Sequence, residues 1–208
     1  MINNNFEEIL MNRKSVKVFD EQVKIPKAEM DEMIKKATTA PSSVNMQPWR
    51  FLVVESDEGK DTLRPLIRFN TRQNDSSAAM VVIFGDMKSQ TNAEEIYGNA
   101  VKHDLMPEEV KQEMLEKVIP LYDNATKEQM NDIVKIDSSL AAMQFMLVAK
   151  AHGYDTNPIG GFDKENIAEI IGYDSERYIP VLAIAIGKKA QEAHDSVRLP
   201  VHEIREYL

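Results

Sequence analysis

The spacing of apolar residues along the chain predicts helices in one set of segments and strands in another. In the first helical segment Phe6, Ile9 and Leu10 share one face, and later segments repeat this three-to-four-residue spacing. Prolines mark boundaries, because a proline suits the first turn of a helix and disfavours its continuation. The pattern predicts helices over residues 3–12, 26–40, 57–72 and 163–171, and helices broken at Pro107 and Pro120 between residues 89 and 135.

The strongest helical signal runs from Lys127 to His152, and Gly153 follows it as a helix terminator. Its second half, LAAMQFMLVAKA, is apolar on nearly every side. A helix without a polar face must be buried all round. In a chain of this size the pattern predicts a central helix that is shared with a second subunit. A central helix within one monomer is the alternative.

Short runs of β-branched and aromatic residues predict three strands, of which the second and third are buried, and the last segment is expected to be extended before a helical turn at the C-terminus. Helices and strands do not alternate regularly, which favours an α+β fold over a doubly wound parallel sheet. No linker, repeat or low-complexity tract divides residues 1–208, so one domain is predicted. The predicted strands are Trp49–Glu55, Ala79–Phe84 and Tyr178–Gly187.

Composition narrows the functional classes. The net charge of −9 argues against nucleic acid and anionic membranes as partners. The chain has no cysteine, which excludes disulfides, thiolate catalysis and cysteine-based metal sites. Neither a secretory signal nor an apolar stretch long enough to span a bilayer is visible, so we expect a cytoplasmic protein.

Several familiar active-site motifs are absent from the sequence. There is no Gly-x-Gly-x-x-Gly cradle, no P-loop and no Gly-x-Ser-x-Gly elbow. The four histidines lack the spacing of metal ligands. Candidate chemistry must therefore come from other polar clusters.

A basic cluster lies near the start of the chain, in the segment Arg13–Phe19, where three cations and a hydroxyl fall within five residues. Arginine can bind phosphate through two parallel hydrogen bonds, lysine adds a point charge, and serine donates one more bond. A phosphate site is one interpretation. A solvated basic turn is the other, and the cluster taken alone favours the turn.

A second cluster is the segment Ala40–Trp49, in which two prolines bracket small and amide side chains before a predicted strand. Proline stiffens such a loop, and serine and asparagine supply donors and acceptors. A connecting loop with good turn residues is the simplest account. It leaves unexplained why four hydrogen-bonding side chains stand directly before the only tryptophan of the chain.

Together these clusters resemble the opening of the nitroreductase family of flavoproteins. The pattern Arg-x-Ser-x-Lys-x-Phe at residues 13–19 is followed by Pro-Ser-Ser-x-Asn-x-Gln-Pro-Trp at residues 41–49. The match runs from Ile9 to Pro200. Later landmarks keep the family's order, with Asn-Thr-Arg-Gln at residues 70–73, Asn-Pro-Ile-Gly-Gly-Phe-Asp at 157–163 and Arg-Leu-Pro at 198–200.

The resemblance implies a nitroreductase-like α+β fold, with helices flanking a central mixed or antiparallel sheet and a homodimer built around the long helix. It also implies FMN, bound non-covalently at the dimer interface, with NADH or NADPH as co-substrate. Carried over by position, the phosphate would be held by Arg13, Ser15 and Arg198, with Lys14 beside the phosphate or the ribityl chain. The partner subunit would contribute Pro41, Ser42, Ser43 and Asn45.

The ring of the flavin would be contacted by a third set of positions. Asn70 and Gln73 would bond its pyrimidine edge, and Lys17 would lie near N1 and the C2 carbonyl. Pro158 and Ile159 would cover one face, with the Gly160 N–H directed at N5 and Gly161 beside it.

The resemblance implies no side-chain acid or base, because the chemistry takes place at N5 of the cofactor. Lys17 would stabilise the negative charge of the reduced ring, and Gly160 would let the backbone approach it closely. Three positions depart from the family pattern. Ser196 replaces a lysine that many bacterial relatives carry, Gly160 replaces a common glutamate, and Gln73 replaces a lysine found in some relatives.

The reaction implied is a two-step, ping-pong hydride transfer from NAD(P)H to a small electron-poor acceptor such as a nitroaromatic or a quinone. Donor and acceptor would use the same open face of the flavin in turn. One alternative is a flavoenzyme of the same fold with other chemistry, namely dehydrogenation, enone reduction or dehalogenation. Another is a flavin-binding protein without catalysis.

Overall fold

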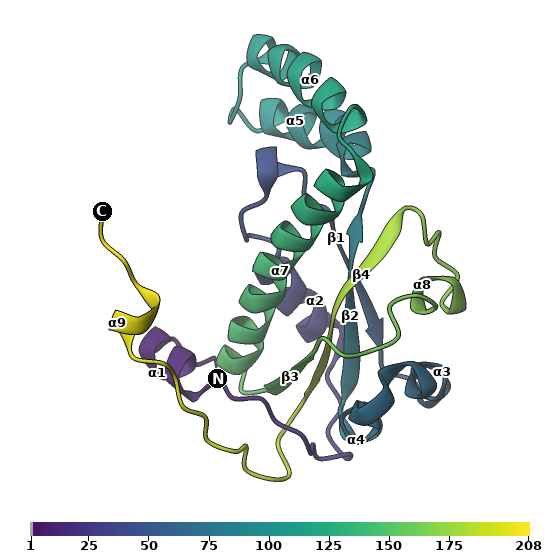
Figure 1. The fold of residues 1–208 in the computed structure, drawn as a ribbon, viewed down its shortest axis with the longest axis vertical. Helices are drawn as coiled ribbons and strands as arrows, with labels where there is room; N and C mark the ends of the chain where they lie inside the picture. Colours follow the sequence, from purple (N-terminus) through teal and green to yellow (C-terminus); the bar gives the residue numbers. More distant parts are fainter. Residues whose placement is uncertain (1) are drawn as a thin grey trace.

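A four-stranded antiparallel sheet lies at the centre of the computed structural model, which describes residues 2–208 (Figure 1). The strand order is β1-β2-β4-β3, and the two middle strands are the most apolar. The three predicted strands are confirmed within a few residues of their expected ends. The strands are β1 (Trp49–Val54), β2 (Ala79–Asp86), β3 (Asp155–Ile159) and β4 (Tyr178–Gly187).

The strand β3 was not predicted from the sequence. Its sequence, Asp-Thr-Asn-Pro-Ile, has no apolar alternation, and Pro158 lacks the N–H that a central strand needs. β3 is an edge strand, where that loss is tolerated. Its outer side is covered by Ser15, which forms a parallel bridge with Thr156. Pairing with β4 rather than local preference makes this segment a strand.

Alternate residues of β2 point to opposite faces of the sheet and join two different cores. Val81 and Ile83 pack with α2 (Lys27–Ala37) and α7 (Lys127–Ala151). Val82 and Phe84 pack with α3 (Asp57–Ile67) and α8 (Ile167–Ile170). The period of two along this strand therefore explains why helices cover both faces of the sheet.

The helix predicted from Lys127 to His152 is confirmed as α7, and a capping box between Thr126 and Gln129 starts it. Its inner face is buried against the sheet and α2. Its outer face carries Ile136, Leu140 and Met143, which are 63%, 45% and 38% exposed. These three residues, four and then three positions apart, form what we call the α7 stripe.

Several helix boundaries differ from the sequence-based predictions. The continuous helix expected over residues 57–72 is wrong, because Arg68 adopts a positive φ of 55° and ends α3. A short 3-10 turn, Arg68–Asn70, and then α4 (Thr71–Ser76) follow. The break expected at Pro120 is also wrong. Pro120 lies inside α6 (Glu108–Asp123) at an exposed position, where water can satisfy the carbonyl that loses its donor.

The helices α5 (Ala93–Lys102) and α6 extend beyond one end of the sheet, at the top of Figure 1. Two further 3-10 turns, Ser43–Asn45 and Ser89–Asn92, lie near their base. A separate apolar cluster joins these helices to the first half of α7. It contains Met46, Tyr97, Leu115, Tyr122 and Val134.

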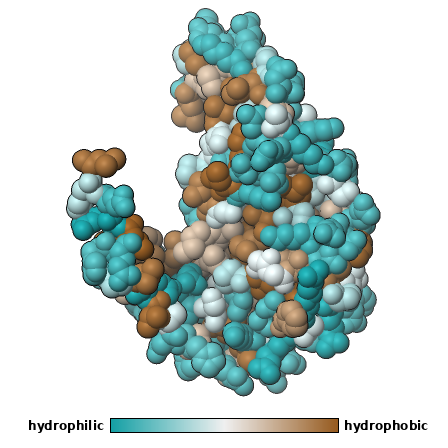
Figure 2. All heavy atoms as spheres, in the orientation of Figure 1, coloured by the Kyte–Doolittle hydropathy of each residue, from teal (hydrophilic) through white to brown (hydrophobic). Residues whose placement is uncertain are grey.

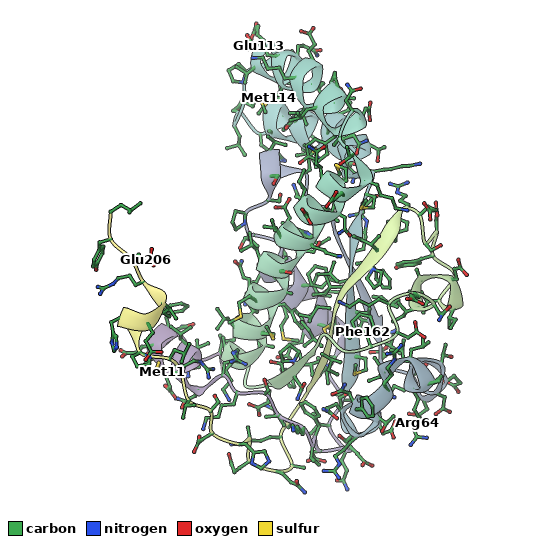
Figure 3. All side chains as sticks on the ribbon, in the orientation of Figure 1. Met11, Arg64, Glu113, Met114, Phe162 and Glu206 are labelled. Carbon is green, nitrogen blue, oxygen red and sulfur yellow. The ribbon has the colours of Figure 1, made fainter. Side chains whose placement is uncertain are left out.

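The two terminal segments lie away from the sheet, on the left of Figure 1. The helix α1 (Phe6–Asn12) and the C-terminal arm, residues 189–208 with α9 (Val201–Ile204), stand apart from the sheet (Figure 1). Met11 and Glu206 are labelled on this side in Figure 3. Figure 2 shows hydrophobic residues on the arm and on the part of the body that faces it. None of the helices in residues 2–208 is both long and apolar enough to cross a membrane.

Candidate functional site

The basic cluster is fastened along the free edge of β3 by backbone hydrogen bonds. The Val16 N–H donates to the Thr156 carbonyl at 3.0 Å, and the Asn157 side chain donates to the Val16 carbonyl at 2.9 Å. These bonds hold residues 13–17 beside residues 158–161, the end of β3 and the two glycines after it, which we call the glycine loop. The structure thus brings together two segments that the sequence separates by about 140 residues.

The start of the C-terminal arm lies on the other side of the basic cluster. The Asp20 N–H donates to the Lys188 carbonyl at 2.8 Å, and the Ala190 N–H donates to the Val18 carbonyl at 3.0 Å. Lys14 forms an ion pair with Asp195, and this contact lowers the pKa of the Asp195 carboxyl.

Asn70 and Gln73 complete this region from the corner between α3 and α4. The Gln73 amide donates to the Asn70 side-chain oxygen at 3.0 Å. The Asp163 N–H donates to the Leu66 carbonyl at 2.8 Å and ties the glycine loop to the same corner. We call this assembly the basic edge. It consists of Arg13–Lys17, Asn70, Gln73, Pro158–Gly161 and residues 188–195.

The basic edge presents polar groups that the protein itself leaves available. In the described residues 2–208, no acidic side chain pairs with Arg13 or Lys17. Arg198, on the C-terminal arm outside the basic edge, is exposed and donates only to Ser196 and Val197 among the described residues. Free cations with side-chain amides nearby suit a phosphate joined to a planar, hydrogen-bonding ring.

The glycines of the basic edge leave open space beside the backbone. A Cβ added at Gly160 or Gly161 would meet no atom within 4 Å, and neither residue has a positive φ. The fold of one chain therefore does not require glycine at either position. The open space beside both residues is compatible with glycines that leave room for a ligand.

The predicted loop at residues 41–47 lies elsewhere, and we call it the anchored loop. Its Ser43 contacts Asp137 in the first half of α7, whereas β3, to which the basic cluster is fastened, follows the last residue of α7, Ala151. At the ordinary rise per residue, roughly 20 Å of helix axis separates Asp137 from Ala151. One chain does not bring the two parts of the predicted site together.

A cleft of about 540 Å³ lies between the anchored loop and α5. The cation within it, Arg50, is already engaged, because it donates to the fully buried Asp86 at 3.1 Å. Asp86 also accepts two bonds of 2.9 Å from Arg177. Amides are the most frequent polar groups in the lining. They belong to Asn45, Gln47, Asn92 and Asn99.

Sequence reasoning missed four residues around these sites. Asp137, Tyr97 and Tyr122 bond to the anchored loop from α7, α5 and α6, and nothing local in the sequence links them to it. Burial raises the pKa of Asp137 above its usual range and raises that of Tyr122 to about 12. Phe69, which is 98% exposed, stands directly before Asn70.

Comparison with known proteins shows the family of the chain. The Nitroreductase family matches residues 10–188. The chain belongs to the nitroreductase family. The predicted family and α+β fold are therefore confirmed, and with them the prediction of an oxidoreductase.

Two crystal structures from this family are similar over nearly their whole length. One is a Staphylococcus epidermidis protein described as a "putative NAD(P)H:FMN oxidoreductase", with 64% identity, a TM-score of 0.99 and coverage of 100% of this chain and 98% of that one. The other, from Exiguobacterium sibiricum, is described as a "putative nitroreductase in complex with FMN", with 47% identity, a TM-score of 0.97 and coverage of 100% and 99%.

A third relative has a different named activity. The CLA biosynthesis enone reductase of Lactiplantibacillus plantarum is 39% identical over 99% of this chain and 92% of its own length. Family membership therefore does not by itself select the acceptor.

Proposed function

We propose that this protein is an FMN-dependent NAD(P)H oxidoreductase that works as a homodimer and reduces nitroaromatics, quinones or similar small electron-poor acceptors. One observation carries the proposal: the basic edge has free cations and amides in the positions that the family motif assigns to the flavin. We further propose that residues 1–208 form a single cytoplasmic domain.

Each set of residues at the basic edge would hold one part of the cofactor. Arg13 and Ser15 would bind the phosphate together with Arg198 of the C-terminal arm, and the amides of Asn70 and Gln73 would bond the pyrimidine edge of the ring. Lys14 would bind more weakly, because Asp195 already neutralises its charge. FMN, when bound, supplies the hydride chemistry between NAD(P)H and the acceptor.

Lys17 and the glycine loop would support the reaction without transferring a proton themselves. Lys17 is exposed, and a cation close to the ring would stabilise the negative charge that accumulates there on reduction. Pro158 and Ile159 would exclude water from one face of the ring. The Gly160 N–H would orient the ring through one hydrogen bond.

The α7 stripe and the C-terminal arm support the homodimer. An exposed apolar stripe with spacings of four and three is typical of two helices that pack together. The arm adds Val197, Leu199, Val201, Ile204 and Tyr207, each more than 60% exposed in one chain. A two-fold axis would let the anchored loop of one subunit reach the basic edge of the other, which one chain alone cannot do.

The visible spectrum of the purified protein tests the proposal directly. The protein should be yellow, should release FMN rather than FAD on heating, and should bleach when NADH or NADPH is added. With donor and acceptor sharing one face, double-reciprocal plots should be parallel. A colourless protein that takes up no added FMN would refute the flavin proposal, and intersecting lines would refute the shared face.

Enone reduction is a second candidate, favoured by the identity to the Lactiplantibacillus plantarum enzyme. A panel that contains a nitroaromatic, a quinone and an α,β-unsaturated ketone separates the two. Faster NADPH or NADH consumption with the ketone than with the other acceptors would favour enone reduction.

A further inference from the structure

The anchored loop has an unusual backbone for its sequence. Val44, Asn45 and Gln47 have φ values of 43°, 60° and 47°, although none of them is glycine. This region is disfavoured for residues with a Cβ, and most strongly for a β-branched residue such as valine. Such conformations persist where surrounding contacts hold them in place.

Three helices supply those contacts. The Asp137 carboxylate of α7 accepts the Ser43 N–H at 3.0 Å and the Ser43 hydroxyl at 3.2 Å. The Tyr122 hydroxyl of α6 donates to the Ser43 carbonyl at 3.3 Å, and the Tyr97 hydroxyl of α5 donates to the Val44 carbonyl at 2.9 Å. Four hydrogen bonds therefore converge on two consecutive residues.

The anchor is buried although the loop is not. Asp137 is 3% exposed and Tyr97 is 3% exposed, whereas Ser43 lies on the surface of the single chain. A buried carboxylate is costly unless its oxygens accept hydrogen bonds. In the described part of the chain Asp137 accepts bonds only from Ser43, so its side chain is committed to the shape of this loop.

We propose that Asp137 is a positioning residue for the flavin site, acting together with Tyr97 and Tyr122. These residues hold the anchored loop in the one backbone shape that lets Pro41–Asn45 meet the flavin of the partner subunit. The inference rests on the proposed function. It adds that Ser43 serves chiefly as the point where the loop is fastened, because its N–H, hydroxyl and carbonyl all bond inward.

The proposal predicts different outcomes for two substitutions at the same position. Asp137→Ala leaves both Ser43 donors without their acceptor and frees the loop. Asp137→Asn keeps an oxygen for the Ser43 N–H, and its amide can donate to the Ser43 hydroxyl once that group rotates. The geometry is then retained while the charge is removed. A role through hydrogen bonding therefore predicts rescue by asparagine.

FMN titration of the apo-protein, followed by quenching of flavin fluorescence, provides the test. Asp137→Ala should raise the dissociation constant of FMN roughly tenfold or more, and Asp137→Asn should stay within about threefold of the unmodified protein. The matched control is Ser138→Ala. Ser138 is the next residue of α7 and is fully buried, and its hydroxyl has no hydrogen-bond partner among the described residues. Its removal should leave FMN affinity unchanged.

A second pair of variants keeps the test valid if Asp137→Ala does not fold as a dimer. Tyr97→Phe combined with Tyr122→Phe removes two of the four bonds and preserves the packing of both rings. This double variant should weaken FMN binding several-fold. Tyr154→Phe is its control, because the Tyr154 hydroxyl donates to Glu29 at 2.9 Å at the far end of α7.

The outcomes separate this inference from the proposed function. If the unmodified protein binds no FMN, the proposed function fails and the positioning role fails with it. If the unmodified protein binds FMN, and a folded Asp137→Ala dimer or the double phenylalanine variant binds it equally well, the positioning role alone is wrong. A loss of affinity that Asp137→Asn does not rescue would also overturn it, because charge rather than geometry would then be responsible.

Discussion

The basic edge and the anchored loop present polar groups in opposite ways. At the basic edge the backbone is fastened by strand-like pairing, and Arg13 and Lys17 form no ion pair with an acidic side chain of residues 2–208. In the anchored loop the polar groups of Ser43 are used inside the protein, and the backbone is held in a strained shape. The first region offers bonds to a ligand, and the second offers a rigid surface. Their separation along α7 is the reason for our proposal that a complete site takes one region from each of two subunits.

The largest effect should come from damaging the basic edge in one chain and the anchored loop in another, and then mixing the two chains. Arg13→Ala damages the basic edge and Asn45→Asp damages the anchored loop, so each homodimer should be inactive or weak. When the two variants are unfolded and refolded together, about half of the dimers are mixed. A mixed dimer has one doubly damaged site and one intact site, so activity and bound FMN should recover to about a quarter of all sites.

Each variant refolded alone is the control and should recover nothing. If mixed dimers form and no activity returns, both residues act within one chain, and the proposal that each site is built from two subunits is wrong.

Breaking the α7 stripe should have the next largest effect. In the proposed homodimer, Leu140→Glu places a charge on an apolar face that would pair with itself across the two-fold axis, so the dissociation constant of the dimer should rise on the order of a hundredfold or more. Sedimentation velocity measures this change, and FMN should be lost as the dimer dissociates. Ile170→Glu is the control. Ile170 is 49% exposed, against 45% for Leu140, and lies on α8 across the molecule (Figure 1). A dimer of Leu140→Glu with normal affinity would place the interface elsewhere.

A smaller effect is expected within the basic edge itself. Lys17→Ala should lower the reduction potential of the bound flavin by roughly 30–60 mV, because a charge-assisted contact contributes about 1.5–3 kcal/mol. It should slow the reductive half-reaction more than it weakens FMN binding. Lys14→Ala is the comparison, since Lys14 is paired with Asp195 and should shift the potential less. If the bound flavin has the same reduction potential in Lys17→Ala as in the unmodified protein, Lys17 does not act on the flavin ring.

The smallest effect concerns the contacts of Glu29 with His152 and Tyr154 at the end of α7, next to the basic edge, which we call the clamp. Glu29 accepts bonds from His152 at 3.1 Å and Tyr154 at 2.9 Å, and the hydrogen bond from His152 is the largest cause of its lowered pKa. Because the folded-state pKa lies below the usual value of 4.5, this contribution to stability is present above that pH and is lost as the pH falls through the folded-state pKa.

Glu29→Gln should therefore reduce the free energy of unfolding by roughly 0.5–1 kcal/mol at pH 7, and the difference should disappear in acid. Urea unfolding at several pH values measures it. Asp31→Asn, an exposed site on the same helix, is the control. FMN affinity should not change in either variant. A loss of affinity in Glu29→Gln would show that the clamp shapes the basic edge as well as the α2–α7 packing.

Much of the candidate site could be predicted from the sequence because its chemistry is carried by short motifs. Arg13, Lys17 and Gly160 stand in segments whose order along the chain is sufficient to indicate the family. The same is true of the strands β2 and β4, whose continuous apolar runs can only be buried. In these places local composition and the final fold agree.

Other features depend on contacts between distant residues. Pro158 belongs to a strand only because β3 pairs with β4 along one edge and Ser15 pairs with Thr156 along the other. Pro120 stays in a helix because its position is exposed. The apolar sequence of α7 predicted burial on all sides, yet in one chain its stripe is open. These differences arise because pairing and exposure are properties of the whole chain.

By itself, the sequence determined the α+β class, the motifs that indicate a flavin cofactor and the apolar surface of α7. Each follows from local patterns and their order along the chain. Only the tertiary structure decided that Asp137, Tyr97 and Tyr122 fasten the loop at residues 41–47, and that this loop lies far from the basic edge. A hydrogen bond between Ser43 and Asp137 joins residues 94 positions apart. Such a contact depends on how helices and sheet pack together, and no local pattern encodes it.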